Sequence, residues 1–146
     1  MKRRMMVLAA MAAVVMAVAV ACNPQFLGEG SLTATDEAPY VALNWPAATA
    51  MHDGEPIIEY AIEVDGVEVS RVDGWVTSCT LKGLSNATTY TIGVTAYDAG
   101  GRFSGDATQN GRLTVVHTTQ SSGDSGWAVF CEQATGSTTT TTISGD

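Results

Sequence analysis

The sequence has few of the side chains that build metal sites or catalytic sites. Its two histidines, His52 and His117, are far apart and lack Cys or carboxylate neighbours at metal-ligand spacing, so we predict that both are surface residues and that no metal is bound. No Gly-x-Ser-x-Gly elbow is present, which argues against an esterase or protease site. The sequence therefore predicts no catalytic residues, no cofactor and no enzyme.

Basic residues are also scarce, at seven Lys and Arg against fifteen Asp and Glu, with a formal net charge of −8. Beyond residues 1–21 only Arg71, Lys82, Arg102 and Arg112 remain, without clustering. Binding to nucleic acid needs several cations on one surface to neutralise phosphates, so we expect no nucleic-acid partner. The acidic balance also disfavours electrostatic attraction to anionic lipid and favours solubility after export.

A helical period is missing from residues 32–119. Short segments of alternating apolar and polar residues stand there instead, separated by Pro, Gly, Asp and Asn, and this pattern is typical of half-buried β-strands. The Asp65-Gly66 pair between two such segments predicts a hairpin. The apolar positions that we expect on one strand face near this hairpin are Ile58, Tyr60, Ile62 and Val64. The spacing predicts an all-β, seven-stranded Greek-key β-sandwich of immunoglobulin-like type.

The N-terminus has the pattern of an export signal. Lys2, Arg3 and Arg4 precede a small and apolar run over residues 5–21, which ends at Cys22. The sequence Ala19-Val20-Ala21-Cys22 resembles the lipobox of bacterial lipoproteins. The resemblance implies cleavage after residue 21 and diacylation of the Cys22 thiol, so that the chain would be held extracytoplasmically at the membrane of the cell envelope. An ordinary cleaved signal and an uncleaved membrane anchor remain the alternatives.

The order of features over residues 31–119 resembles a fibronectin type III domain. Trp45 precedes a proline, Leu84 stands six residues before Tyr90, and residues 94–98 lead into a glycine-rich turn. The alternation of apolar and polar residues around Trp45 and Tyr60 predicts that both pack in the core. The resemblance implies that Leu84 and Tyr90 form a tyrosine corner, in which the Tyr hydroxyl contacts the backbone a few residues upstream.

The two other cysteines, Cys79 and Cys131, form an even pair in an oxidising compartment. A disulfide between them is one interpretation, and a small core side chain at Cys79 is the other. Residues 22–30 have no period and contain several turn-forming residues, so we expect a short tether to the lipid. Residues 120–146 are rich in Ser, Gly and Thr and predict a flexible tail. The apolar island 127–131 within it would either add a strand to the domain or bind a partner.

Two tryptophans are the candidate ligand contacts. Trp75 follows Gly74 at the start of a predicted strand, and Trp127 lies in the apolar island of the tail. Aromatic side chains in loops often bind glycans or proteins, although a Trp at such a junction also covers the edge of a sandwich. The sequence therefore predicts a lipid-anchored, non-catalytic binding or adhesion module for a protein or glycan ligand. The alternative is a structural spacer, or a fragment of a larger surface protein, without a ligand of its own.

Overall fold

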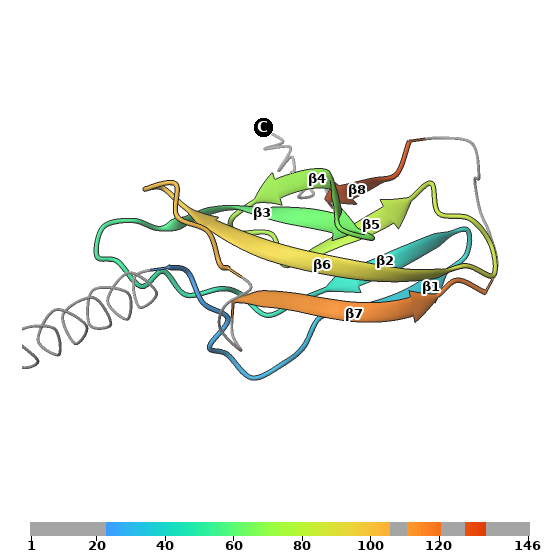
Figure 1. Cartoon of the computed structure of the whole chain (residues 1–146), viewed down its shortest axis with the longest axis horizontal. Coiled ribbons are helices and arrows are strands. Elements are labelled where there is room, and N and C mark those ends of the chain that lie inside the picture. Colours follow the sequence, from blue (N-terminus) through green and yellow to red (C-terminus); the bar gives the residue numbers. More distant parts are fainter. Residues whose placement is uncertain (1–22, 106–110, 121–127, 134–146) are drawn as a thin grey trace, which may run out of the picture.

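The computed structural model describes residues 23–105, 111–120 and 128–133. Strands in these residues form two antiparallel four-stranded sheets with the orders β1-β2-β5-β8 and β4-β3-β6-β7, packed face to face (Figure 1). The described strands are β1 (Thr33–Glu37), β2 (Tyr40–Asn44), β3 (Ile57–Val64), β4 (Val67–Asp73), β5 (Ser78–Lys82), β6 (Thr89–Asp98), β7 (Arg112–Thr118) and β8 (Phe130–Gln133). The predicted all-β sandwich is confirmed, with eight strands in place of seven.

The core lies between the sheets and is centred on aromatic side chains. Tyr60 is fully buried, and its ring centroid lies 5.7 Å from that of Trp45 and 6.2 Å from that of Phe26. The Tyr60 hydroxyl accepts a hydrogen bond of 2.8 Å from the Ala48 amide, so its buried polar atom is satisfied. Burial raises the pKa of Tyr60 above its ordinary value, and the hydrogen bond from Ala48 opposes part of that shift.

Phe26 falls in the segment 22–30 that we predicted to be a short tether outside the domain, but residues 24–26 are docked on the domain. Pro24 is fully buried, and Gln25 exchanges two backbone hydrogen bonds with Thr49, of 3.0 and 2.7 Å. An extended segment beside an unpaired stretch of backbone gains these bonds at the same time as it buries an aromatic ring. The folded unit therefore begins before residue 31.

The alternation predicted for β3 also fails at one residue. Tyr60, Ile62 and Val64 are buried as expected, but Ile58 is exposed. A register irregularity between Ile57 and Glu59 in the pairing of β3 with β6 interrupts the alternation just there. An extra residue of this kind turns the next side chain to the other face of the sheet.

The eighth strand comes from the predicted flexible tail. Cys131 and Cys79 are joined by a disulfide with a Cα–Cα separation of 5.7 Å, and β8 pairs antiparallel with β5. The Cys131 amide also donates a 2.7 Å hydrogen bond to the Ser70 hydroxyl on β4. Residues 130–133 thus complete the sheet edge of their own domain, which is the first of the two alternatives given for the apolar island, and they are not part of a flexible tail. Trp127 lies outside the described residues, as does Cys22.

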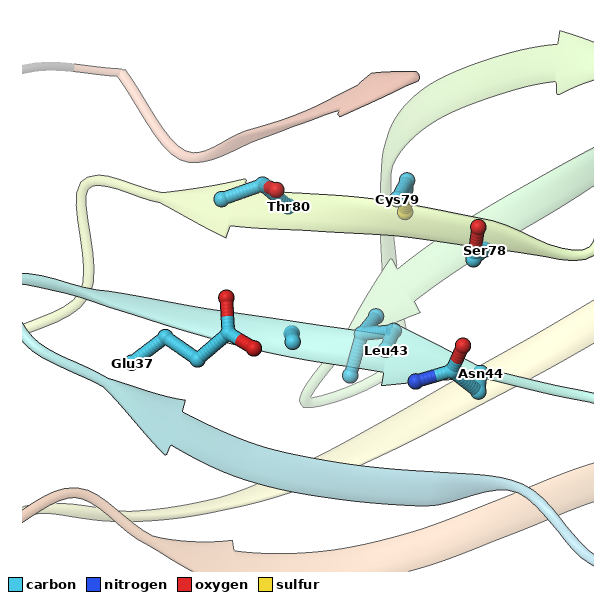
Figure 2. A pocket seen from close by; sticks show the side chains of 7 residues that line it. Glu37, Leu43, Asn44, Ser78, Cys79 and Thr80 are labelled. Carbon is cyan, nitrogen blue, oxygen red and sulfur yellow. The ribbon is translucent and has the colours of Figure 1, made fainter. Parts of the chain in front are cut away.

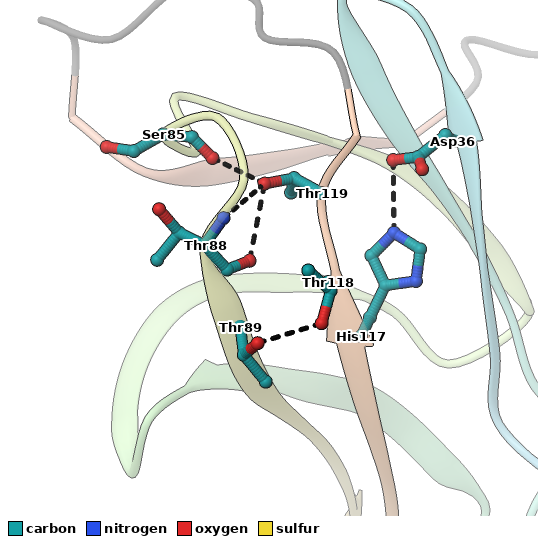
Figure 3. A network of polar contacts seen from close by, with 7 residues as sticks. All are labelled: Asp36, Ser85, Thr88, Thr89, His117, Thr118 and Thr119. Carbon is teal, nitrogen blue, oxygen red and sulfur yellow. Dashed lines mark hydrogen bonds and ion pairs between the residues drawn. The ribbon is translucent and has the colours of Figure 1, made fainter.

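One end of the sandwich, here called the corner end, is closed by polar contacts between β5, β6 and β7. The Ser85 amide donates a 2.9 Å hydrogen bond to the hydroxyl of Tyr90, above the buried Leu84, as the resemblance implied. The Thr119 hydroxyl donates to the Ser85 carbonyl at 2.6 Å and accepts from the Thr88 amide at 3.1 Å (Figure 3). These bonds satisfy backbone groups in the turn where β5 leads into β6.

Candidate functional site

The opposite end, here called the loop end, is where β2, β4 and β6 finish and β3 begins (Figure 1). Exposed large hydrophobic side chains gather there. In the part of the chain that the structure describes, five of the eight such side chains lie at or beside this end, and we call them the loop-end set: Leu27, Met51, Ile58, Trp75 and Phe103. Single exposed hydrophobics are ordinary, but several large ones at one end mark a candidate interaction surface.

Trp75 is the most exposed aromatic residue of the set, at 70% of its full surface. The turn after β4 holds it there, since the Val76 amide donates a 2.9 Å hydrogen bond to the Asp73 carbonyl. The Gly74 amide donates to the Ile58 carbonyl at 2.8 Å, and a Cβ on Gly74 would clash with the backbone of residue 57. Glycine at position 74 therefore allows the close backbone approach that fixes the position of the tryptophan.

Phe103, which is 53% exposed, is held by the turn that follows β6. The carboxylate of Asp98 is buried and accepts hydrogen bonds from the Arg102 amide at 2.9 Å and from Arg102 Nε at 3.0 Å. The Gly101 amide donates to the Asp98 carbonyl, and its φ of +79° suits glycine. Phe103 then pairs with Tyr97, at 5.8 Å between ring centroids. Hydrogen bonds and a ring contact thus hold the turn, although its aromatic residue is more than half exposed.

The outer face of the β4-β3-β6-β7 sheet carries ion pairs beside these aromatic residues. Arg71 bonds Glu59 and Glu68, and its guanidinium lies 4.5 Å from the centroid of the Tyr97 ring. The hydrogen bond from Arg71 lowers the pKa of Glu68, and the two carboxylates raise the pKa of Arg71. Such half-exposed ion pairs contribute little to the stability of the fold. Their charged side chains make this face of the sheet polar.

A shallow hollow lies on the other sheet, on the face of β2 and β5 (Figure 2). Its polar side chains are one carboxylate, one amide and two hydroxyls, from Glu37, Asn44, Ser78 and Thr80. General acid–base chemistry by two carboxylates, or nucleophilic attack assisted by a histidine, needs partners that this set lacks. The hollow is therefore a polar surface depression and not the candidate site.

The histidines are placed apart. His52 lies in the connection between β2 and β3, whereas His117 on β7 contacts the carboxylate of Asp36 on β1, at 3.1 Å. Among the described residues, no group of three or more His, Cys, Asp and Glu side chains is arranged to hold a metal ion. Nor do those residues include a helix of the length and hydropathy needed to cross a membrane.

Of the residues singled out from sequence, Trp45, Tyr60 and Leu84 are buried and Trp75 is exposed. Sequence reasoning missed the rest of the loop-end set. Phe103 follows a glycine-rich turn, where a large aromatic residue is unusual enough to have signalled exposure. Leu27 and Met51 carry no comparable local signal. They follow Gln25 and Thr49, which pair with each other across a long stretch of sequence.

Comparison with known proteins identifies the family. The sequence profile of the fibronectin type III domain matches residues 28–110, which is more than half of the chain. Among solved structures, the 6th fibronectin type III domain of human fibronectin type III domain containing protein 3 is 32% identical, with 66% of this chain and 89% of that chain covered and a TM-score of 0.41.

A second solved structure, the Clostridium perfringens spore cortex lytic enzyme SleM, is 18% identical, with a TM-score of 0.48 over 61% of this chain. This chain covers only 27% of that enzyme's length. No curated protein sequence matches the chain. Fibronectin type III domains are general binding or spacer modules and are typically non-catalytic. On the match of the family profile to residues 28–110, this chain belongs to the fibronectin type III domain family.

Proposed function

We propose that this chain is a lipid-anchored, extracytoplasmic module of a bacterial cell envelope, and that its domain binds a partner and has no catalytic activity. The apolar run over residues 5–21 and the lipobox-like sequence that ends at Cys22 support the anchor. The family supports a binding or spacer role. The observation that carries binding over spacing is the gathering of exposed hydrophobic residues at the loop end.

Large aromatic side chains are favoured at binding surfaces because they bring much contact area and have few rotatable bonds to order. Trp75 and Phe103 meet this description, and the turns that carry them are fixed by backbone hydrogen bonds. Because the backbone of each turn is already ordered, less conformational entropy is lost when a partner covers the aromatic residue on it. The loop end is therefore the surface that we assign to binding.

The spacer role is the second candidate, and the outer faces of the sheets favour it. Pairs such as Lys82 with Glu132 and Arg112 with Glu63 leave these faces polar. A spacer needs only such a soluble surface and a stable core. The two candidates differ in what they expect of the loop end, since a spacer leaves Trp75 open to solvent in the cell.

Intact mass and detergent partitioning test the anchor directly. The full chain is expressed in a bacterium beside a Cys22→Ala variant and an Asn23→Ala control. We expect the wild type and the control to lose residues 1–21, gain acyl mass and enter the detergent phase, while Cys22→Ala does none of these. An unacylated soluble product, or an uncut chain, from the wild type would overturn the anchor.

Oxidative footprinting separates binding from spacing without knowledge of the ligand. Trp75 is oxidised on intact cells and in the purified, unacylated chain lacking residues 1–21, without detergent, and each rate is referred to that of Phe130, which is exposed away from the loop end. A binding module protects Trp75 on cells relative to the purified protein. A spacer gives the same relative rate in both samples.

A further inference from the structure

The folded domain begins almost at the cysteine that we propose to be acylated. Asn23 alone separates Cys22 from Pro24, which is fully buried. Gln25 is then paired with Thr49, and Phe26 is packed against Tyr60. One residue of chain spans at most about 3.6 Å, so a lipid on Cys22 lies within about two such steps of the docked segment. The chain offers no long tether that would let the domain move away from the membrane.

The docked segment lies at the same end of the sandwich as the loop-end set. In Figure 1 the chain enters the domain on the side where β2 runs toward β3 and where β6 ends. Leu27 follows Phe26 directly, and Ile58 lies at the start of β3. Met51, Trp75 and Phe103 lie on the connections at this end. A lipid at Cys22 would therefore bring this end of the sandwich, and not the corner end, to the bilayer surface.

The residue types at the loop end suit a bilayer interface. Trp is enriched at the boundary between headgroups and acyl chains, because its ring is apolar and its N–H is polar. Phe and Leu are typical of surfaces that lie in this boundary by burying apolar area. Trp75, Phe103 and Leu27 supply these types, and Met51 adds a flexible apolar chain.

Charged side chains do not attract the loop end to a lipid bilayer. At the loop end, Arg71 is engaged by Glu59 and Glu68, and Arg102 by Asp98. Asp53 in the connection between β2 and β3 adds negative charge. Anionic lipid would be repelled rather than recruited, so contact with a bilayer must come from apolar burial next to the lipid anchor.

We infer that the partner of the loop end is the bilayer interface itself, so that the domain stands on the membrane with its corner end outward. This inference rests on the proposed acylation of Cys22. The loop-end set, with Trp75 and Phe103 as its aromatic members, enters the headgroup region. The short connection from Cys22 to Pro24 converts lipid anchoring into a fixed orientation of the domain.

Quenching of tryptophan emission by brominated lipid tests the orientation. The acylated full chain is reconstituted into phosphatidylcholine vesicles with plain or brominated acyl chains. Trp75→Phe gives the background emission from Trp45 and Trp127. Two further variants in the Trp75→Phe background carry a single new reporter, Leu27→Trp at the loop end or Val67→Trp at the exposed β3–β4 turn of the corner end. Circular dichroism confirms that each variant is folded, and intact mass confirms that it is acylated.

We expect brominated vesicles to quench the emission of Trp75 and of Leu27→Trp, and to leave that of Val67→Trp unchanged. Phosphatidylglycerol in the vesicles does not increase the quenching. Acylated protein that shows no quenching at either end, or equal quenching at both, overturns the orientation while the anchor stands; the loop end then faces another ligand or none. Protein without acyl mass overturns the anchor and this inference together.

Discussion

The two ends of the sandwich differ in the side chains that their connecting turns carry. At the corner end, Tyr90, Thr88 and Thr119 bond the backbone of the turn, and Leu84 closes the core beneath them. At the loop end the turns are equally well bonded, but they direct large apolar side chains such as Trp75 into solvent. Hydrogen bonding alone therefore does not prevent an end of the sandwich from binding a partner, because the exposed side chains decide what that end contacts.

Among the substitutions that test this difference between the two ends, we expect the largest loss of stability from Tyr60→Ala. Tyr60 packs in the core near the loop end. Tyr60→Ala removes its contacts with Trp45 and Phe26 and leaves the Ala48 amide without its acceptor. We expect the free energy of unfolding to fall by about 3–5 kcal/mol, as for other large aromatic residues cut to Ala in a core. Urea denaturation followed by circular dichroism measures it. A loss no larger than that of Val67→Ala, at the exposed turn, would contradict this account.

Removal of the disulfide should weaken the loop end more than the corner end. The bond spans 52 residues, and Cys79→Ala/Cys131→Ala is expected to cost about 2–4 kcal/mol of unfolding free energy, as is typical of native disulfides. It also frees β8, whose Gln133 side chain accepts a hydrogen bond from the Asp73 amide beside the Trp75 turn. Hydrogen exchange should therefore rise at Gly74 more than at Ser85. Equal rises at the two amides would be evidence against this link.

Tyr90→Phe removes one hydrogen bond from the corner end. The Ser85 amide loses its acceptor while the ring stays in place. We expect a loss of about 0.5–1.5 kcal/mol in denaturation, which is the usual net contribution of one hydrogen bond. Tyr40→Phe is the control, because Lys82 contacts the face of the Tyr40 ring, which the substitution retains. Equal losses in the two variants would show that the Tyr90 hydroxyl does not stabilise the corner.

Trp75→Ala should have the smallest effect on stability, within about 0.5 kcal/mol of the wild type, because it removes a side chain that is mostly in solvent. Trp45→Ala is the matched comparison, since the same substitution there empties a core site. Denaturation of both variants measures the difference. A large loss for Trp75→Ala would mean that this side chain covers the sandwich edge and is not free for a partner.

Much of the fold was predictable because alternation is a local property. Residues 90–96 alternate, and β6 forms over them; the Asp65-Gly66 hairpin forms where the sequence placed it. Ile58 was mispredicted because the irregularity that turns it outward depends on how β3 meets β6, and no pattern within β3 reports that. The candidate site was only partly predictable. Trp75 stood out by residue type, whereas Leu27 and Met51 belong to the loop end through contacts between distant segments.

The sequence by itself determined the fold class, the aromatic core around Trp45 and Tyr60, and the acidic charge, because these depend on residue type and short-range spacing. Only the tertiary structure decided that Phe26 docks on the core and that residues 130–133 close a sheet edge through Cys79 and Cys131. Both segments are too short to specify a partner locally. They become ordered because the assembled sandwich offers them unpaired backbone and apolar surface at the same place.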